Sequence, residues 1–151
     1  MNDGKNGFTM IEILVAIAII LILVGIGVFV FYEAREKAEL DGITDGIAST
    51  LEKAQSNALN GGNGLPYGVR FQSNSYTYFS GNSYDPSDPS DVTVSIDSGH
   101  GISDNISGDT VIFSRLTGVP DATGTVTVTD LSSDETQTVT IGNQGDITVV
   151  K

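Results

Sequence analysis

Three aspartates recur at every third position in one polar segment, Asp85-Pro-Ser-Asp-Pro-Ser-Asp91. Ca²⁺ binds oxygen ligands, roughly six to eight of them, and often adds backbone carbonyls to carboxylates. Asp85, Asp88 and Asp91 are therefore the calcium candidates of this chain. Their spacing is not that of an EF-hand, and the intervening prolines stiffen the segment. We expect a solvated acidic loop here, and no cofactor.

Other residue types with catalytic or metal-binding chemistry are scarce. His100 is the only histidine, it lies between Gly99 and Gly101, and the chain has no cysteine. Thiolate metal sites and cysteine nucleophiles are therefore excluded, and a histidine-based metal site lacks a second histidine. No serine stands in a nucleophile-elbow motif. We predict that the chain is not an enzyme and that His100 is a surface histidine in a loop.

Glu12 is the acidic residue inside an otherwise uncharged run that extends from Phe8 to Tyr32. A carboxylate within a membrane-spanning segment costs about 2.5–3.5 kcal/mol on insertion scales, so it requires a partner. Near the start of a helix, the free N–H groups and the helix dipole also favour a negative charge. Glu12 therefore either caps a helix at the membrane interface or supplies a countercharge for another group.

The chain is strongly acidic, with 19 acidic side chains against 7 basic ones and a formal net charge of −12. Nucleic-acid binding depends on Lys and Arg side chains that neutralise phosphates. Only Arg70, Arg115 and Lys151 lie beyond the N-terminal helix and its linker, and Asp146 lies close to Lys151 in sequence. A nucleic-acid partner is therefore disfavoured, and the composition fits an exposed, water-facing domain.

One long helix is expected to position Glu12. At about 1.5 Å per residue, a helix over residues 8–32 is about 37 Å long, enough to cross a hydrocarbon core of about 30 Å. The helical pattern continues through an amphipathic half, residues 33–60, and a stop signal follows at Asn60-Gly61-Gly62. The apolar stripe of this half comprises Ala34, Ala38, Leu40, Ile43, Ile47, Leu51, Ala54 and Ala58. Its burial requires the rest of the chain.

Residues 61–151 are predicted to form a β-rich globular head. Tyr67–Gln72 and Ser75–Ser80 read as a hairpin around Ser73-Asn74. Further strands are expected at Val92–Asp97, Thr110–Ser114, Gly124–Asp130, Glu135–Ile141 and Asp146–Val150. The predicted fold class is α+β, with a long N-terminal hydrophobic helix packed on a small antiparallel β-sheet head. A loop around residues 82–91, which contains Tyr and Asp, should lie on the surface of the head.

Two simpler interpretations of the N-terminus are a cleavable secretory signal and a plain signal anchor. The apolar region of a secretory signal is usually about 7–15 residues long and is followed by a small-residue cleavage site. Here the run is longer, and the charged sequence Glu33-Ala34-Arg35-Glu36-Lys37 follows it. A signal anchor explains every residue of the segment except Glu12.

The residues Gly7-Phe8-Thr9-Met10-Ile11-Glu12, followed at once by the apolar run, closely resemble the processing site of bacterial type IV prepilins and type II secretion pseudopilins. The resemblance implies that residues 1–7 are a leader, which a prepilin peptidase cleaves after Gly7. The same enzyme would then N-methylate Phe8. It also implies that Glu12 pairs with the N-terminal amine of a neighbouring subunit during assembly. Many major pilins carry a kinking proline in the apolar segment, and this sequence departs from that pattern.

The head is similar to the C-terminal half of the H-type minor pseudopilins and of related minor pilins. This similarity rests on the order Val111-Ile112-Phe113, Leu116-Thr117-Gly118, Gly124-Thr125-Val126-Thr127-Val128, Val139-Thr140-Ile141 and Gly145-Asp146-Ile147. It implies a structural minor subunit of a type II secretion pseudopilus or a type IV pilus. The implied location is the bacterial inner membrane, crossed once with the head on the extracytoplasmic side, and then the filament.

The partners that this resemblance implies are the prepilin peptidase/N-methyltransferase, other pilin or pseudopilin subunits, and the inner-membrane assembly platform. Two other functions stay open. A minor pilin of a pilus tip, for adhesion or DNA uptake, would be supported by a basic or aromatic patch on the head. A membrane-anchored domain that never polymerises would be supported if Glu12 were dispensable.

Overall fold

The computed structural model describes residues 7–151, with side chains for all of them except residues 27–33 and Gly62. The predicted leader, residues 1–7, therefore lies outside the described residues except for Gly7. The chain divides into two compact units, one up to Lys37 and one from Ala38 onward. Each unit is described by itself.

Helix α1, Met10–Leu59, is the one α-helix among the described residues. It begins two residues later than the predicted start at Phe8, because Thr9 precedes it as a non-helical cap. It ends where expected: the N–H of Gly61 donates to the carbonyl of Ala58 at 3.2 Å, and Gly61 has a φ of +63°. That left-handed conformation is the usual C-terminal stop of a helix, and glycine adopts it without steric cost.

Two four-stranded antiparallel sheets follow the helix. The first has the order β3-β2-β1-β5 and the second the order β4-β6-β7-β8. The strands are β1 Tyr67–Gln72, β2 Ser75–Ser80, β3 Val92–Ser95, β4 His100–Asp104, β5 Thr110–Phe113, β6 Gly124–Asp130, β7 Thr136–Ile141 and β8 Ile147–Val150. Short 3₁₀ turns occupy Gly62–Gly64 and Ser107–Asp109. The predicted α+β class with an antiparallel head is confirmed, although the head has two sheets.

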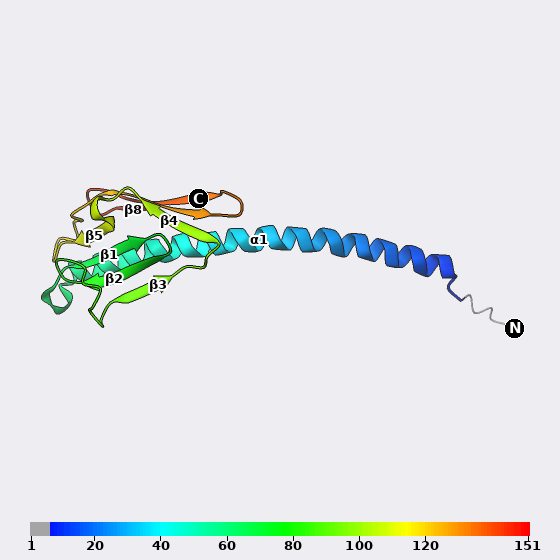
Figure 1. Ribbon diagram of the computed structural model, residues 1–151, viewed down its shortest axis with the longest axis horizontal. Coiled ribbons are helices and arrows are strands. Elements are labelled where there is room, and N and C mark those ends of the chain that lie inside the picture. Colours follow the sequence, from blue (N-terminus) through cyan, green and yellow to red (C-terminus); the bar gives the residue numbers. More distant parts are fainter. Residues whose placement is uncertain (1–6) are drawn as a thin grey trace. The chain divides into compact units, whose positions relative to one another are not determined.

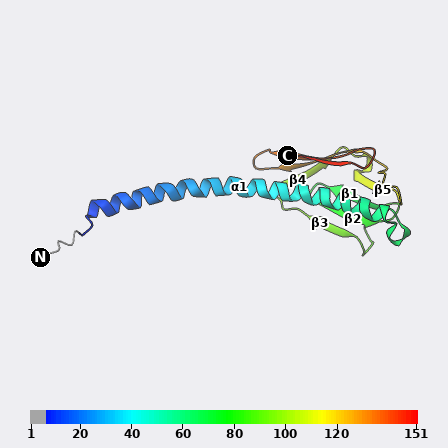
Figure 2. The same cartoon turned by 180° about the vertical axis from the view of Figure 1, so that it is seen from behind.

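In the unit from Ala38 onward, the second half of α1 lies between the two sheets (Figure 1), and the view from behind agrees (Figure 2). The helix buries Leu40, Thr44, Ile47, Ala48, Leu51, Ala54 and Ala58, at the helical spacing of three to four residues. Against this stripe pack Val69, Phe71, Val111 and Phe113 from one sheet and Val126, Val128, Val139 and Ile141 from the other. Ala34 and Ala38 were expected in the stripe, but both are exposed.

Strand β4 was not expected from the sequence. His-Gly-Ile-Ser-Asp lacks a run of β-branched or aromatic residues. The strand forms because β6 offers a ladder for it, with Ile102 opposite Val128 and His100 opposite Asp130. His100 is consequently 6 % exposed, so the prediction of a surface loop histidine was wrong.

The C-terminal end of α1 is fixed by loops that are distant in sequence. The N–H of Leu116 donates to the carbonyl of Ala58 at 2.8 Å, which satisfies one of the carbonyls that a helix end leaves free. Gln55 donates through Nε2 to the carbonyl of Gly145 at 2.8 Å and to that of Gly118 at 3.3 Å. The loops after β5 and β7 therefore hold the last turns of the helix.

Candidate functional site

The bond between Gly7 and Phe8 lies in accessible backbone. Both residues are exposed, and neither belongs to a helix or strand. The Phe8 side chain is 80 % exposed, so its ring makes no substantial contact with the described residues. A peptidase must bind its substrate in an extended form, and this segment can meet that need without unfolding of α1.

Thr9 and Glu12 form the N-terminal cap of α1. The N–H of Glu12 donates to Oγ1 of Thr9 at 3.3 Å, and the N–H of Ile13 donates to the carbonyl of Thr9. Thr9-Met10-Ile11-Glu12 thus has the Thr-x-x-Glu pattern of a capping box, with Glu12 at the third helical position. The pattern could have been read from the sequence, and Thr9 is the functional residue that the sequence analysis missed.

The carboxylate of Glu12 lies in the first turn of α1, where the helix dipole favours its charge. Among the described residues, no cation pairs with this carboxylate, so both interpretations of Glu12 are consistent with the geometry. Its assembly role stays a prediction, as do cleavage after Gly7 and methylation of Phe8.

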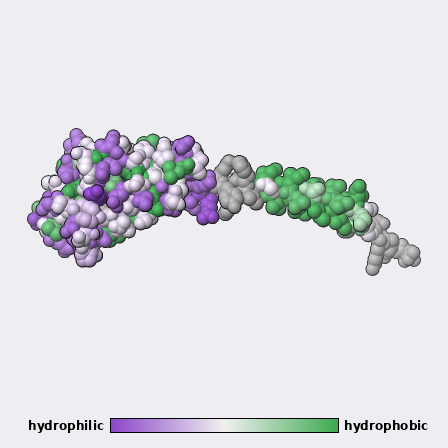
Figure 3. Space-filling model, in the orientation of Figure 1, coloured by the Kyte–Doolittle hydropathy of each residue, from purple (hydrophilic) through white to green (hydrophobic). Residues whose placement is uncertain are grey.

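From Met10 to Ile26, the first unit carries an apolar surface that Glu12 alone interrupts with a charge. Every side chain from Met10 to Ile26 is exposed, among them Leu14, Leu21 and Leu23 at more than half of their area. Figure 3 shows this segment as hydrophobic. A single soluble chain rarely leaves so much contiguous apolar surface uncovered. Within the described side chains, no helix contains an apolar stretch long enough to cross a membrane; residues 27–32 of the predicted span lie outside this description.

The acidic segment before β3 is a loop, as predicted. Asp85 accepts a hydrogen bond from the N–H of Ser87, and Asp88 accepts one from the N–H of Ser90, so each carboxylate closes its own local turn. Burial raises the pKa of Asp91, and the charges of Asp88 and Asp85 raise it further. Both carboxylate oxygens of Asp91 are buried without a hydrogen-bond partner.

This arrangement brings the charges of the three aspartates close enough to interact. Among the described residues, however, no three acidic or histidine side chains are grouped so that they could share a metal ion. Calcium binding by Asp85, Asp88 and Asp91 therefore stays a prediction of the sequence and gains no support from the geometry.

His100 is held by a carboxylate at one end of β4. Its Nδ1 lies 3.0 Å from Oδ1 of Asp97, which also accepts the N–H of Gly99. The hydrogen bond from His100 is the main cause that lowers the pKa of the Asp97 carboxyl. Nε2 of His100 is buried without a partner. The hydrogen bonds of the Asp97 carboxylate to Gly99 and His100 therefore fix the turn that precedes β4.

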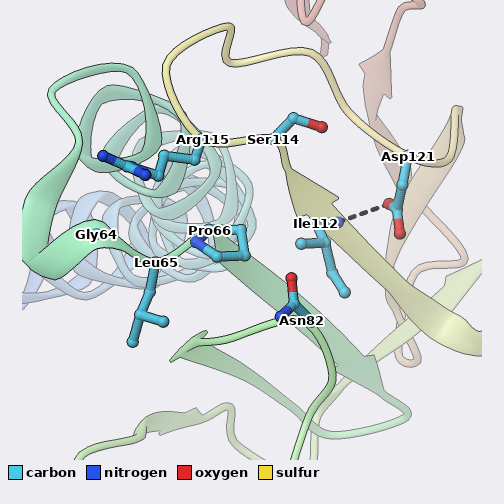
Figure 4. A pocket seen from close by; sticks show the side chains of 8 residues that line it. All are labelled: Gly64, Leu65, Pro66, Asn82, Ile112, Ser114, Arg115 and Asp121. Carbon is cyan, nitrogen blue, oxygen red and sulfur yellow. Dashed lines mark hydrogen bonds between the residues drawn. The ribbon is translucent and has the colours of Figure 1, made fainter.

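A pocket of about 510 Å³ opens beside the start of β1 and the end of β5. Figure 4 shows Asn82, Ser114, Arg115 and Asp121 around it. Asp121 is already engaged, because its carboxylate accepts the N–H of Ile112 at 2.8 Å. Half of the eight lining residues are thus polar or charged, and none of them is a histidine.

Comparisons with known proteins agree with this structure. Residues 2–28 match the prokaryotic N-terminal methylation motif, and residues 44–145 match the type II transport protein GspH family. The fold is similar to that of the minor pseudopilin EpsH from the Type 2 Secretion System of Vibrio cholerae, with a TM-score of 0.58 and 15% identity over 74% of this chain and 96% of that chain. No curated protein matches the sequence.

The match to the family covers about two thirds of the chain, and the methylation motif includes Gly7, Phe8 and Glu12. The family is a structural one, and its members are processed by a prepilin peptidase and assemble with other pilin subunits. The chain therefore belongs to the type II transport protein GspH family, and both resemblances drawn from the sequence, to prepilins and to H-type minor pseudopilins, are confirmed.

Proposed function

We propose that this chain is a minor structural subunit that helps to begin or tip a type II secretion pseudopilus. A prepilin peptidase cleaves it between Gly7 and Phe8 and methylates the new N-terminus. The observation that carries the proposal is the succession of an accessible Gly7–Phe8 bond, a capped helix start and an exposed apolar helix surface, followed by a GspH-type head.

Before assembly, the apolar segment anchors the chain in the inner membrane, with the head on the extracytoplasmic side. In the filament, the same segment packs against the helices of other subunits. The exposed side chains from Met10 to Ile26 support both states, because each removes apolar surface from water. The assembly platform of the inner membrane moves the subunit from the membrane into the filament.

Glu12 provides the countercharge for the methylated amine of a neighbouring subunit. An unpaired carboxylate in an apolar environment is costly. Insertion of the helix is therefore favoured when Glu12 is paired with the amine of the neighbouring subunit. The capping-box position supports this role, since it fixes the carboxylate at the first turn, close to the level of Phe8.

No observation favours a nucleic-acid-binding tip subunit. Lys151 pairs with Asp45 on α1, and the guanidinium of Arg70 lies over the ring of Tyr84. Two of the three cations of the head are thus engaged within the chain, and the third, Arg115, is one of the residues that line the pocket.

The test is the intact mass of the protein extracted from the membranes of its native cell, with Glu12→Ala and Glu12→Asp as variants. A mature species that begins at N-methylated Phe8 is expected for all three proteins. Glu12→Ala should be depleted from sheared filaments, whereas Glu12→Asp, which keeps the charge, should retain part of the incorporation.

Two results would contradict the proposal. An uncut Met1 species in cells with an active prepilin peptidase would leave a signal anchor. Normal incorporation of Glu12→Ala would remove the assembly role of Glu12 and keep the processing.

A further inference from the structure

Strand β3 is an exposed sheet edge without the usual protection. It has β2 on one side and no strand on the other, and Figure 1 shows it as the outermost strand of its sheet. All four residues of Val92–Ser95 are exposed, and none is charged, Pro or Gly. Natural proteins commonly blunt an edge with charges, prolines, bulges or a covering segment, because its free N–H and C=O groups invite another strand.

The opposite edge of the same sheet is covered by the chain itself. Beside β5, the N–H of Ser114 donates to the carbonyl of Val119 at 2.8 Å. The N–H of Ile112 donates to the carboxylate of Asp121, and the carbonyl of Ile112 accepts the N–H of Asp121 at 2.9 Å. The outward N–H and C=O of Ile112 and the N–H of Ser114 are therefore satisfied, so the C-terminal end of this edge is covered.

The second sheet is covered at its β4 edge. On β4, the outward N–H of Ile102 donates to the carbonyl of Ser73 in the β1–β2 turn at 2.9 Å. Strand β8 is flanked by the charged residues Asp146 and Lys151, and Lys151 ties its end to α1. Among the described strands, β3 and β8 are thus the two outer strands whose outward backbone groups no loop covers, and β8 is tied to α1 at its end through Lys151.

The register identifies which groups of β3 are free. The N–H of Ile96 donates to the carbonyl of Asn74 at 3.0 Å, and Ser95 lies opposite Ser75. Hydrogen-bonded and non-hydrogen-bonded pairs alternate in an antiparallel ladder, so Val94 bonds to β2 while Thr93 and Ser95 point their N–H and C=O groups away from it. In the described part of the chain, no loop or turn bonds to these groups of Thr93 or Ser95.

A pocket lies beside this edge, between β3 and α1. It measures about 290 Å³ and is lined by Glu39, Gly42 and Ile43 of the helix, Tyr76 of β2, and the segment Val94–Asp97. Side chains of a strand alternate between the two faces of a sheet. A strand added next to β3 would therefore place every second side chain on the face of Val94, over this largely apolar pocket.

The charges around the edge define the partner. Asp97 comes two residues after the end of β3, and its side chain is 58% exposed. Glu39 adds a second carboxylate at the pocket. A second copy of this chain, with its net charge of −12, would be repelled from such a surface.

We propose that β3 is a docking edge for an extended segment of a different protein, which adds a strand through Thr93 and Ser95. This segment carries alternating apolar side chains, one of which fills the pocket, and basic residues near its end, which face Asp97. Backbone pairing provides affinity and the pocket and charges provide selectivity, as in other cases of strand addition. The identification of this protein as a neighbouring subunit of the filament rests on the proposed function. The strand pairing itself does not depend on that function.

The test uses the full chain in detergent micelles and a fluorescein-labelled peptide of alternating valine and threonine with two lysines at each end. Fluorescence anisotropy measures binding, and residue-resolved amide exchange reports the contact. We expect the amides of Thr93 and Ser95 to gain protection on binding, and that of Val94, which already bonds to β2, to change little.

The matched variants are Ser95→Pro and Ser95→Ala. Proline removes only an outward donor, so binding should weaken about tenfold, whereas alanine keeps the donor and should change binding less than about twofold. Thermal unfolding of both variants checks that the head stays folded. A peptide N-methylated at alternate residues and a peptide with glutamates at its ends should both bind much more weakly.

Several outcomes would overturn the proposal. They are failure of the lysine-ended peptide to bind at millimolar concentration, equal binding by the N-methylated peptide, and equal binding by Ser95→Pro. Self-association of the chain that Ser95→Pro abolishes would show that a second copy occupies the edge and would refute the charge argument. None of these results affects cleavage at Phe8 or incorporation through Glu12, so the two proposals can fail separately.

Discussion

Nζ of Lys151 donates a hydrogen bond to Oδ2 of Asp45 at 2.9 Å, which joins the last residue of the chain to α1. The same ammonium lies 3.5 Å from Oδ1 of Asp41. Asp41 also accepts a hydrogen bond from Nε2 of Gln137 on β7 at 2.7 Å. The two C-terminal strands are therefore held to the helix by polar contacts as well as by the core.

Substitution of Lys151 should loosen this attachment in a pH-dependent way. The hydrogen bond to Asp45 is the main cause that raises the pKa of Lys151. A raised pKa in the folded state means that this contribution is fully present below the ordinary lysine pKa, about 10.4, and is lost as the pH rises through the folded value. Lys151→Met should therefore be slightly less stable than the wild type at neutral pH and indistinguishable from it at strongly alkaline pH.

Urea unfolding of both proteins in micelles, at two salt concentrations, measures this difference. High salt should shrink it, because both partners are partly exposed and screened. A difference that stays constant with pH and salt would mean that Lys151 acts through packing of its stem instead.

Gly68→Ala should destabilise the head. A Cβ at this position would lie 2.6 Å from Cζ of Phe79 and 2.7 Å from the carbonyl oxygen of Val111. The backbone of β5 cannot move aside without loss of its pairing with β1, so we expect a cost of about 1–3 kcal/mol. Thermal unfolding gives the value.

Gly42→Ala is the matched control for that substitution. A Cβ at Gly42 would meet nothing within 4 Å, and the residue is exposed inside α1. Alanine is favoured over glycine in a helix interior by about 1 kcal/mol, so this variant should be more stable than the wild type. A shift of both variants in the same direction would argue against the close approach at Gly68.

Asp130 should make the head sensitive to acid. Its carboxylate accepts hydrogen bonds from the hydroxyl and the N–H of Ser132, both at 2.7 Å, and the hydroxyl is the main cause that lowers the pKa of Asp130. The contribution of a depressed carboxyl is present above its unfolded pKa, about 3.9, and is lost as the pH falls through the folded value.

Asp130→Ala should therefore cost roughly 1 kcal/mol at neutral pH and flatten the acid limb of the stability curve. Denaturant unfolding at neutral pH and at a pH below 3.9, the ordinary carboxyl value, checks this. Asp130→Asn keeps an acceptor for the N–H of Ser132, so its stability at neutral pH should lie between those of the wild type and Asp130→Ala. An unchanged acid limb in Asp130→Ala would show that another carboxylate controls it.

Thr9→Ala should fray the start of α1. It removes the hydroxyl that accepts the N–H of Glu12, and loss of such a cap typically costs about 1 kcal/mol. Amide exchange at Ile11 and Glu12 should accelerate about fivefold, the equivalent of this energy. Thr9→Ser retains the acceptor and should exchange like the wild type, and equal acceleration in both variants would exclude the capping role.

Much of the fold could be predicted because its signals are local. The bounds of β1, β2 and β6 coincide with the predicted ranges, since each strand has strong β-formers and a clear turn at its end. β3, β5, β7 and β8 differ from prediction by one or two residues at an end. Strand β4 was missed because its residues have little strand preference and depend on the ladder that β6 provides.

The sequence by itself determined the N-terminal methylation motif, since Gly7, Phe8 and Glu12 lie within six consecutive residues and the apolar run follows them directly. Helix capping and apolar surface are properties of neighbouring residues. Only the tertiary structure decided which sheet edges are covered, that His100 is buried and that Lys151 pairs with Asp45. Each of these depends on residues far apart in sequence, whose pairing is fixed by the packing of both sheets on one helix and by strand register.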